Sequence, residues 1–216
     1  MTKALGWLAI LGIVAGLVFA FGVAPKEVTQ GNVQRIMYLH VPSVLTAYLA
    51  FAVVLISSLF VLFKGSAAAD RWGHAACEIG VIFTGITLVS GSIWGKPTWG
   101  TWWTWDARLT STAILFLIYA GALLLRGMVD DAERGARYAA VVGIIGALNI
   151  PIVHFSVTWW RTLHQPATIL TPERAPISGS IALALFVNWA ALTLLFAYLM
   201  AKRIDLRRLE DEAWSN

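Results

Sequence analysis

The sequence predicts an all-α integral membrane protein with six transmembrane helices, and three observations support this fold class. The chain of 216 residues is 58% hydrophobic and only 13% charged, whereas soluble domains carry about 25% charged residues. Its apolar residues occur in long unbroken runs, each close to the ~20 residues that a helix needs to cross a bilayer. No internal repeat, low-complexity segment or soluble domain separates these runs, so we expect one membrane domain over residues 1–216.

The six expected spans can be taken in order along the chain. The first lies ahead of Pro25, the second follows Pro42, and Glu78 lies early in the third, near an expected interface. The fourth, which is the shortest, follows Asp106, whose carboxylate can cap the free N–H groups of a helix start. The fifth contains Pro151, which removes a backbone hydrogen bond and should kink the helix. The expected ranges are 4–24, 43–63, 75–94, 109–125, 139–157 and 179–201.

Basic residues predict the orientation, because the cytoplasmic loops of membrane proteins are enriched in Lys and Arg. With a cytoplasmic N-terminus, ten basic residues lie inside and six outside. The six on the outer side are Lys26, Arg35, Lys96, Arg108, Arg161 and Arg174. The sequence therefore favours both termini inside, with outer connections over residues 25–42, 95–108 and 158–178.

A tryptophan-rich stretch begins at Trp94 and places five tryptophans in twelve residues. If this stretch is helical, Trp99, Trp102, Trp103 and Asp106 fall on one face. A flat indole surface with a charged edge suits a large planar ligand better than a small polar one. Asp106 is compatible with both helix capping and ligand contact. The candidate binding residues in this stretch are Trp99, Trp102, Trp103, Trp105, Asp106 and Arg108.

Membrane anchoring is the ordinary explanation for interfacial tryptophans, but an anchoring belt populates both interfaces. Here seven tryptophans fall on the expected outer side and three on the inner side. The outer ones are Trp94, Trp99, Trp102, Trp103, Trp105, Trp159 and Trp160. This asymmetry favours a binding surface over anchoring alone.

Two histidines, His40 and His164, fall on separate outer connections that flank the tryptophan stretch in chain order. Two imidazoles from separate loops can bind one metal from opposite sides, as in the axial ligation of heme iron. We therefore expect His40 and His164 to be metal ligands; the alternative is two unrelated interfacial histidines. His154, deeper in the fifth span, is a weaker third candidate. His74 is on the inner side and is expected to be an ordinary polar residue.

Heme agrees with these features, since its porphyrin is planar and apolar and can pack on indoles. Its propionates are anionic, and Arg108, Arg161 and Arg35 are available for charge-assisted hydrogen bonds. The single cysteine excludes a Cys-x-x-Cys-His attachment site, so we expect heme b, held non-covalently and transiently. There is no nucleotide-binding Gly-Lys-Ser/Thr loop and no Lys/Arg tract for nucleic acid. The expected protein is therefore not an enzyme, and a partner must supply energy for any transport.

Three segments resemble the heme-handling membrane family that is defined by a tryptophan-rich "WWD" motif. They are Tyr38-Leu-His-Val-Pro-Ser43, Trp99-Gly-Thr-Trp-Trp-Thr-Trp-Asp-Ala-Arg-Leu-Thr110 and the segment from Asn149-Ile-Pro-Ile-Val-His154 to Trp159-Trp-Arg-Thr-Leu-His-Gln165. The larger members of the family have more spans than this chain can hold. The resemblance is therefore to the six-span members, which act in the cytochrome c maturation system.

The resemblance implies that the protein holds heme at the periplasmic face of the bacterial inner membrane. It implies that the tryptophan-rich loop packs on the heme and that His40 and His164 are the axial ligands. Trp159, Trp160 and Arg161, which precede His164, join the expected heme contacts. The implied partners are a periplasmic heme chaperone, the ATPase and membrane subunits (A and B components) of an ATP-binding-cassette transporter, a small single-span D component, and membrane lipid.

Two other functions remain possible from the residues alone. A b-type membrane electron carrier usually needs histidines within its helices, and only His154 lies in an expected span. A non-catalytic membrane subunit could use the tryptophans as a protein-docking surface. Redox cycling with a quinol distinguishes the first alternative, and partner binding that persists without heme distinguishes the second.

Overall fold

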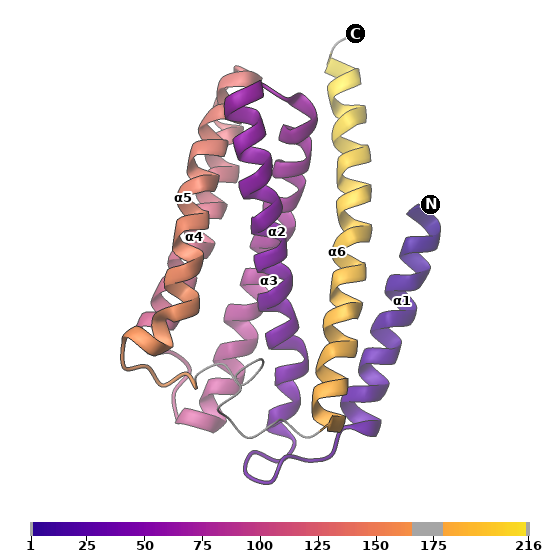
Figure 1. The fold of residues 1–216 in the computed structure, drawn as a ribbon, viewed down its shortest axis with the longest axis vertical. Coiled ribbons are helices and arrows are strands. Elements are labelled where there is room, and N and C mark those ends of the chain that lie inside the picture. Colours follow the sequence, from indigo (N-terminus) through magenta and orange to yellow (C-terminus); the bar gives the residue numbers. More distant parts are fainter. Residues whose placement is uncertain (1, 166–178, 215–216) are drawn as a thin grey trace.

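The computed structural model describes the backbone of residues 2–165 and 179–214, and the side chains of these residues up to Glu210. This part of the chain forms six long helices and no strand, as the sequence predicted (Figure 1). Each helix is long and apolar enough to cross a membrane. The helices are α1 (Thr2–Val18, continued by the π-helical turn Phe19–Val23), α2 (Met37–Lys64, preceded by the 3-10 turn Val33–Ile36), α3 (Ala67–Trp99), α4 (Ala107–Gly127), α5 (Ala132–Trp159) and α6 (Gly179–Trp214).

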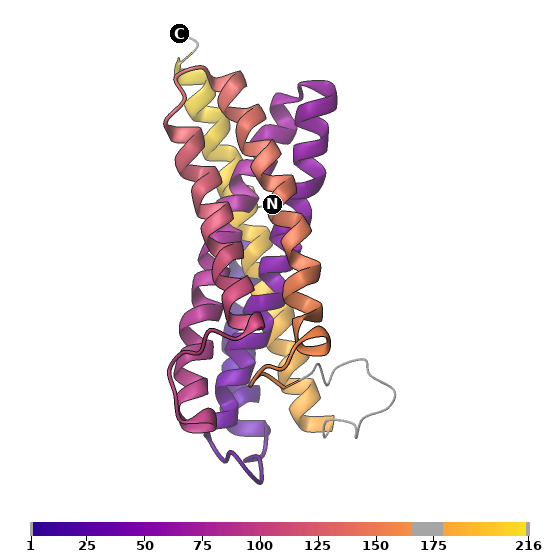
Figure 2. The ribbon, with the colours of Figure 1, turned by 90° about the vertical axis from the view of Figure 1, so that its left-hand side faces the viewer.

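Helices α2 to α5 form a four-helix bundle, and α6 packs against α2 and α3 on one side of it (Figures 1 and 2). Helix α1 packs mainly on α6 and is the outermost helix. Helix α6 ends at the end of the bundle where α2 joins α3 and α4 joins α5, which we call the terminal end, and α1 begins in the half of the bundle nearest to it. The opposite end, formed by residues 24–36, 100–106 and 160–165, is called the tryptophan end. Which end faces the cytoplasm stays a prediction, and residues 166–178, with Arg174, lie outside the described residues.

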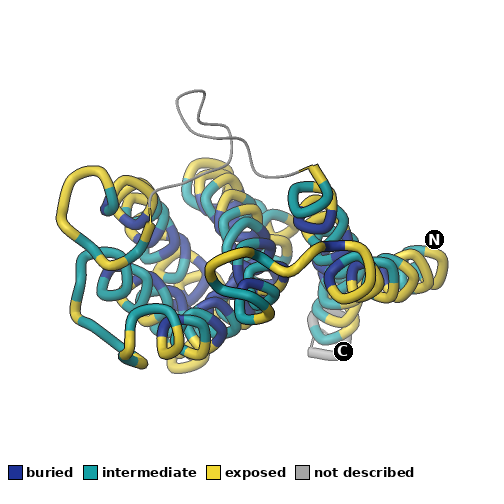
Figure 3. The backbone as a smooth tube through the Cα atoms, turned by 90° about the horizontal axis from the view of Figure 1, so that it is seen from below, coloured by how far each residue is buried: buried dark blue, intermediate teal, exposed yellow. Residues whose placement is uncertain are grey.

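Helix α1 contributes little to the core, since most of its residues are exposed or only partly buried (Figure 3). Its buried residues are Ala9 and Gly16. At Gly16 the chain approaches α6 closely, because Asn188 Nδ2 donates to the Gly16 carbonyl at 3.0 Å. A Cβ at residue 16 would lie 2.6 Å from Asn188 Oδ1, so the contact requires glycine. Most of the large apolar side chains of α1 are exposed, as expected for a helix that faces lipid.

The second helix begins earlier than the sequence predicted, and this changes the position of His40. The expected span began at residue 43, whereas α2 begins at Met37, so His40 lies in a helix rather than in a loop. Tyr38 is 3% exposed and packs in a cluster with Ala20 and Leu185. Packing against α1 and α6 therefore keeps residues 37–41 helical, although Pro42 follows them.

The tryptophan stretch is not one helical face, so that prediction was wrong. Helix α3 extends to Trp99, five residues beyond the expected end, and stops at Gly100. Gly100 has φ +80°, a left-handed conformation that glycine adopts without steric cost. Residues 101–105 then form a loop, and Asp106 caps α4 by accepting from the Leu109 N–H at 2.9 Å. The predicted capping role of Asp106 is therefore confirmed.

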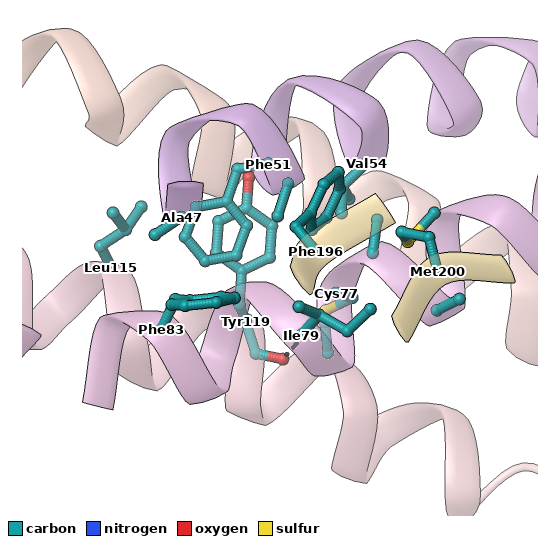
Figure 4. Packing of buried hydrophobic residues seen from close by; sticks show 14 of the residues in the cluster. Ala47, Phe51, Val54, Cys77, Ile79, Phe83, Leu115, Tyr119, Phe196 and Met200 are labelled. Atoms are coloured by element: carbon teal, nitrogen blue, oxygen red, sulfur yellow. Dashed lines mark hydrogen bonds between the residues drawn. The ribbon is translucent and has the colours of Figure 1, made fainter. Parts of the chain in front are cut away.

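The centre of the bundle is closed by two stacked aromatic rings (Figure 4). The rings of Phe51 (α2) and Tyr119 (α4) have centroids 3.8 Å apart and planes 6° apart, and both side chains are fully buried. Tyr119 Oη donates to the Gly143 carbonyl at 3.1 Å. Glycines on the neighbouring helices make room for the rings, since a Cβ at Gly80 or Gly146 would lie 2.5 Å from Phe51 or 2.6 Å from Tyr119.

Replacing Gly146 or Gly80 by alanine is expected to destabilise the fold. The added methyl group must displace a fully buried ring, and overpacking of this kind costs about 1–3 kcal/mol. Gly121→Ala in α4 is the matched control, because nothing lies within 4 Å of its Cβ position. The free energy of unfolding in mixed micelles measures the difference. Equal stabilities for Gly146→Ala and Gly121→Ala would contradict the close packing of the two rings.

Charged side chains join the helices at the terminal end. Arg126 (α4) makes two hydrogen bonds of 2.6 Å to the carboxylate of Asp70 (α3). Glu78 (α3) accepts from Arg203 (α6) and from His74, the latter at 2.9 Å. His74 thus belongs to an ion-pair cluster, as expected of a polar residue outside the binding site. Helix α6 is about 54 Å long at 1.5 Å per residue, and its last turns run beside the bundle as far as the terminal end (Figure 1).

Candidate functional site

The tryptophan end contains a pocket of about 1030 Å³, counting the part that is open to solvent. Its walls come from helices α2, α3, α4 and α5 and from the residues around 101–104 and 164–165. Small apolar residues such as Ala47 and Leu115 line its inner part, just above the stacked rings. Much of this volume is open to solvent, so a large ligand bound here is partly exposed.

His40 and His164 line this pocket together, although they come from distant parts of the chain. His40 lies on α2 and is 8% exposed, while His164 lies on the connection after α5. The centres of the two imidazole rings are 6.4 Å apart and their planes differ by 32°. Tertiary packing therefore brings together the two histidines that the sequence selected.

Each imidazole uses Nδ1 for a hydrogen bond within the protein. His40 Nδ1 lies 3.1 Å from Ser90 Oγ, and His164 Nδ1 lies 2.8 Å from the Gln165 carbonyl oxygen. The His40 ring also has a backbone hydrogen bond with Thr87, and the hydrogen bonds found for the two rings among the described residues otherwise involve Nδ1. Each ring therefore has one nitrogen left for a ligand.

The separation of the two rings fits a metal ion between them. An imidazole nitrogen binds a metal at about 2 Å and lies about 1.1 Å from its own ring centre. Two rings on opposite sides of one ion therefore have centres roughly 6 Å apart, which agrees with the 6.4 Å between His40 and His164. The described residues contain no cluster of three or more His, Cys, Asp or Glu that would form a different metal site.

Of the four tryptophans predicted in the tryptophan-rich stretch, three line the pocket, namely Trp99, Trp102 and Trp103. The ring of Trp99 lies 5.9 Å from that of His164. Trp103 Nε1 is buried and has no hydrogen-bond partner among the described residues, so it is a free donor at the pocket. Trp105, in contrast, is 80% exposed and only contacts the edge of Trp103.

Trp94 belongs to the pocket but was not among the predicted binding residues. Its ring meets that of His40 edge-on, with centroids 5.8 Å apart, and its Nε1 donates to Gln30 Oε1 at 2.8 Å. Sequence analysis assigned Trp94 to the end of a span, whereas α3 continues to Trp99 and turns both side chains toward the site. The signal for it was present, because Trp94 begins the same tryptophan-rich stretch.

The predicted contacts next to His164 are not brought to the pocket. Trp159, Trp160 and Arg161 are exposed where α5 ends, and none of them lines the pocket. The Trp159 ring stacks on Phe155 instead. His154, the third histidine candidate, is also exposed and outside the pocket lining.

Asp106 joins the tryptophan-rich loop to the residues around His164. One carboxylate oxygen caps α4, and the other accepts from the Leu163 N–H at 3.2 Å. This second bond holds the residue that precedes His164. Asp106 therefore positions the histidine through the backbone, and it is not itself part of the pocket lining.

Arg108 is a partly buried cation at the pocket wall. Its guanidinium donates to the His154 carbonyl at 2.7 Å and to Ser156 Oγ at 3.4 Å, both on α5. No carboxylate oxygen of a described residue lies within 4.0 Å of the Arg108 guanidinium, the limit for an ion pair. The charge of Asp106 acts on Arg108 without a direct ion pair, and a guanidinium in this position favours a ligand that brings an anionic group.

His164 is held in its neutral form. Burial lowers its pKa below the ordinary 6.5, and the nearby positive charge of Arg108 lowers it further. The hydrogen bond to the Gln165 carbonyl and the charge of Asp106 act in the opposite direction and are smaller. A neutral imidazole is the form that binds metal ions.

Gly91 on α3 is a further residue of the site that the sequence did not single out. A Cβ at this position would lie 2.8 Å from Cε1 of His40. The His40 ring therefore occupies space that only a glycine leaves open. From the sequence, a single glycine in an apolar span does not show that a neighbouring side chain needs its space. Only the packing of α3 against α2 shows this.

The chain was compared with known protein families and with characterised proteins. Residues 1–215 match the model of the family "CcmC: Heme exporter protein C". The chain is 42% identical to the heme exporter protein C of Bradyrhizobium diazoefficiens over 211 residues, which are 95% of this chain and 80% of that protein. It is 41% identical to the heme exporter protein C of Escherichia coli K12 over 197 residues, 88% of this chain and 80% of that protein. A putative cytochrome c biosynthesis ccmC-like mitochondrial protein of Arabidopsis thaliana is 35% identical over 210 residues, 95% of this chain and 78% of that protein.

Proposed function

The chain belongs to the heme exporter protein C family, whose members handle heme for cytochrome c maturation, and from this premise we propose that it binds heme at its tryptophan end and delivers it to a soluble heme chaperone. One observation carries the proposal: the rings of His40 and His164 lie 6.4 Å apart and line the same pocket. The heme is cargo rather than a resident cofactor.

In this proposal His40 and His164 bind the iron through their Nε2 atoms. Trp99, Trp102 and Trp103 supply apolar surface for the porphyrin face. Trp105 belongs to the same loop and supports Trp103 from the solvent side. Reversible ligand bonds hold the heme b non-covalently, so that it can be released again.

The propionates require positive partners, and Arg108 is the best placed of the candidates because it lines the pocket and has no direct ion pair among the described residues. Arg161 is exposed beyond the end of α5 and is a candidate only for the rim. Arg35 donates to the Phe21 carbonyl at 3.0 Å and lies over the Phe21 ring. The two propionates of one heme are thus proposed to meet Arg108 inside and solvent or Arg161 outside.

Delivery then proceeds by exchange of ligands on a preformed site. The acceptor is a periplasmic chaperone that offers its own iron ligand, and the protein itself forms no covalent bond to heme. The tryptophan end faces the periplasm of a bacterial inner membrane, in agreement with the ten-to-six distribution of basic residues. The ATP-binding-cassette A and B components and the single-span D component are the proposed membrane partners and supply the energy that this chain does not.

The test is a spectrum followed by a transfer assay. The purified protein in detergent is titrated with heme, and a low-spin spectrum with two nitrogen ligands is expected. Addition of a soluble chaperone should then move heme to the chaperone. Reduction of the bound heme by a quinol with no transfer would favour an electron carrier, and chaperone binding that needs no heme would favour a docking subunit.

Heme binding is expected to be independent of pH above about 6.5 and to weaken below it. Because burial lowers the pKa of His164, its imidazole stays neutral at pH 7 and no proton must leave before iron binds. At lower pH, protonation of the His164 imidazole competes with binding of the iron. The unfolded chain takes up this proton at a higher pH than the folded protein does, so the stability of the heme-free protein also falls as the pH is lowered. Heme titrations between about pH 5 and 8 measure this. An affinity that already falls between about pH 8 and 7 would contradict a lowered pKa.

Gly91→Ala is expected to weaken heme binding although it removes no ligand. The new methyl group would meet Cε1 of His40 at 2.8 Å, and relieving such a contact costs about 1–3 kcal/mol, or roughly tenfold or more in affinity. Gly85→Ala on the same helix is the control, because its Cβ would meet Phe116 at an ordinary 3.6 Å. Equal heme affinities for the two variants would show that the position of the His40 ring beside Gly91 is not needed for binding the iron.

A further inference from the structure

The side chain of Ser90 lies directly behind His40. Ser90 is on α3, is 5% exposed, and has its Oγ 3.1 Å from His40 Nδ1. It makes this contact between helices α2 and α3, the two helices that pack most closely in the bundle. No motif in the sequence marked this serine, which is one of several small polar residues in an apolar span.

The direction of the hydrogen bond between Ser90 and His40 follows from the other contacts of the hydroxyl. Ser90 Oγ lies 2.6 Å from the carbonyl oxygen of Ile86 and 3.3 Å from that of Thr87. A carbonyl only accepts, so the single hydroxyl proton of Ser90 is directed to the backbone of its own helix. The oxygen that remains is an acceptor, and His40 Nδ1 must then carry the proton that it donates to Ser90.

We propose that Ser90 is a positioning residue that holds His40 in the Nδ1–H form and leaves its Nε2 lone pair for the iron. The inference rests on the proposed function, in which His40 is a heme ligand. A partner on the second ring nitrogen fixes the orientation of a ligating histidine and makes it a stronger base. Ser90 acts only through His40.

The same arrangement exists at His164 with a different partner. His164 Nδ1 donates to the Gln165 carbonyl at 2.8 Å, and a carbonyl oxygen can only accept. Both histidines therefore carry their proton on Nδ1. The acceptor is a side-chain oxygen at His40 and a backbone carbonyl oxygen at His164. Because a side-chain substitution does not remove a backbone carbonyl, Ser90 is the position at which this hydrogen bond can be tested.

Ser111 on α4 offers a matched control for Ser90. It is also buried, at 7% exposed, and its hydroxyl donates to the carbonyl four residues earlier, that of Ala107, at 2.6 Å. Ser111 does not line the pocket or contact a histidine ring. Ser90→Ala and Ser111→Ala therefore remove the same group from the same kind of helical position, but only the first removes an acceptor from His40.

The first measurement uses the heme-free protein, so that it does not depend on heme binding. The histidine ring nitrogens are labelled with ¹⁵N, and the signals of His40 are assigned by their loss in His40→Ala. We expect His40 to be protonated at Nδ1 in the wild type, Ser111→Ala and Ser90→Thr. In Ser90→Ala the proton should be distributed over both nitrogens. A His40 ring that keeps its Nδ1 proton in Ser90→Ala overturns the inference.

The second measurement is the heme affinity and midpoint potential of the same variants. Ser90→Ala is expected to bind heme about tenfold or more weakly and to have a more positive midpoint potential, because a less basic ligand stabilises the ferric iron less. Ser90→Thr should restore both. If Ser90→Ala does not accumulate as a folded protein, Ser90→Cys replaces it, since a thiol is only a weak acceptor.

The two measurements separate failure of this inference from failure of the proposed function. If His40→Ala binds heme as well as the wild type, the proposed function fails and the role of Ser90 toward iron fails with it. If His40→Ala loses heme while Ser90→Ala keeps the affinity and the potential of the wild type, only the inference about Ser90 is overturned.

Discussion

Replacing His40 or His164 by alanine is expected to reduce heme retention more than any other single substitution in this protein. Each change removes one of the two proposed iron ligands, and loss of even a residue that supports a ligand costs 10–100-fold in metal affinity. A loss of at least about a hundredfold is therefore expected for each variant. The measurement is the heme content after purification and the heme affinity by titration, with the spectrum changing from two nitrogen ligands to one.

The control for both variants is His74→Ala. His74 lies at the opposite, terminal end, where it donates to the Glu78 carboxylate at 2.9 Å and does not line the pocket. Its replacement should leave the heme spectrum unchanged. Equal retention in all three variants would contradict ligation by His40 and His164, and the pocket would then have to serve another ligand.

Arg108→Gln is expected to have the second largest effect. A charge-assisted hydrogen bond contributes about 1.5–3 kcal/mol, so losing the proposed bond to a propionate should weaken heme binding by roughly 10–100-fold. Glutamine keeps a donor for the His154 carbonyl, which Arg108 contacts at 2.7 Å. Heme titration of this variant beside Arg161→Gln tests the assignment, because Arg161 is exposed outside the pocket and should matter less.

The dimethyl ester of heme separates a role in binding from a role in structure. This ligand has the same porphyrin and iron but no propionate charge. If Arg108 meets a propionate, Arg108→Gln should weaken the binding of heme and leave the binding of the diester nearly unchanged. An equal loss for both ligands would instead assign Arg108 to holding α4 against α5 through His154 and Ser156.

Several features of the fold and the site could be predicted from local residue chemistry. The six spans depend only on the length of apolar runs, and each was found within a helix. Asp106 precedes an apolar run and caps α4 as expected. Asn149 is a polar residue in the fifth span, and such residues commonly form hydrogen bonds between helices. It donates to the Ser111 carbonyl on α4 at 2.9 Å.

Other features depended on contacts between distant residues and were predicted wrongly or not at all. The one-face arrangement of Trp99, Trp102 and Trp103 fails because Gly100 ends α3. His40 was expected in a loop, since a proline follows it, but burial of the preceding turn against α1 and α6 makes it helical. Trp159 points away from the pocket because α5 continues to that residue before the chain turns.

The sequence by itself determined the class of protein, its six helices, the pair of histidines and the family, because these depend on composition, run length and motifs that are local along the chain. Only the tertiary structure decided which residues form the site. It brings the rings of His40 and His164 to 6.4 Å, adds Ser90 and Gly91 from α3, and leaves Trp159 outside. The physical reason is that a pocket is formed by the relative positions of packed helices. Those positions are set by contacts such as the Phe51–Tyr119 stack, whose partners are far apart in the sequence.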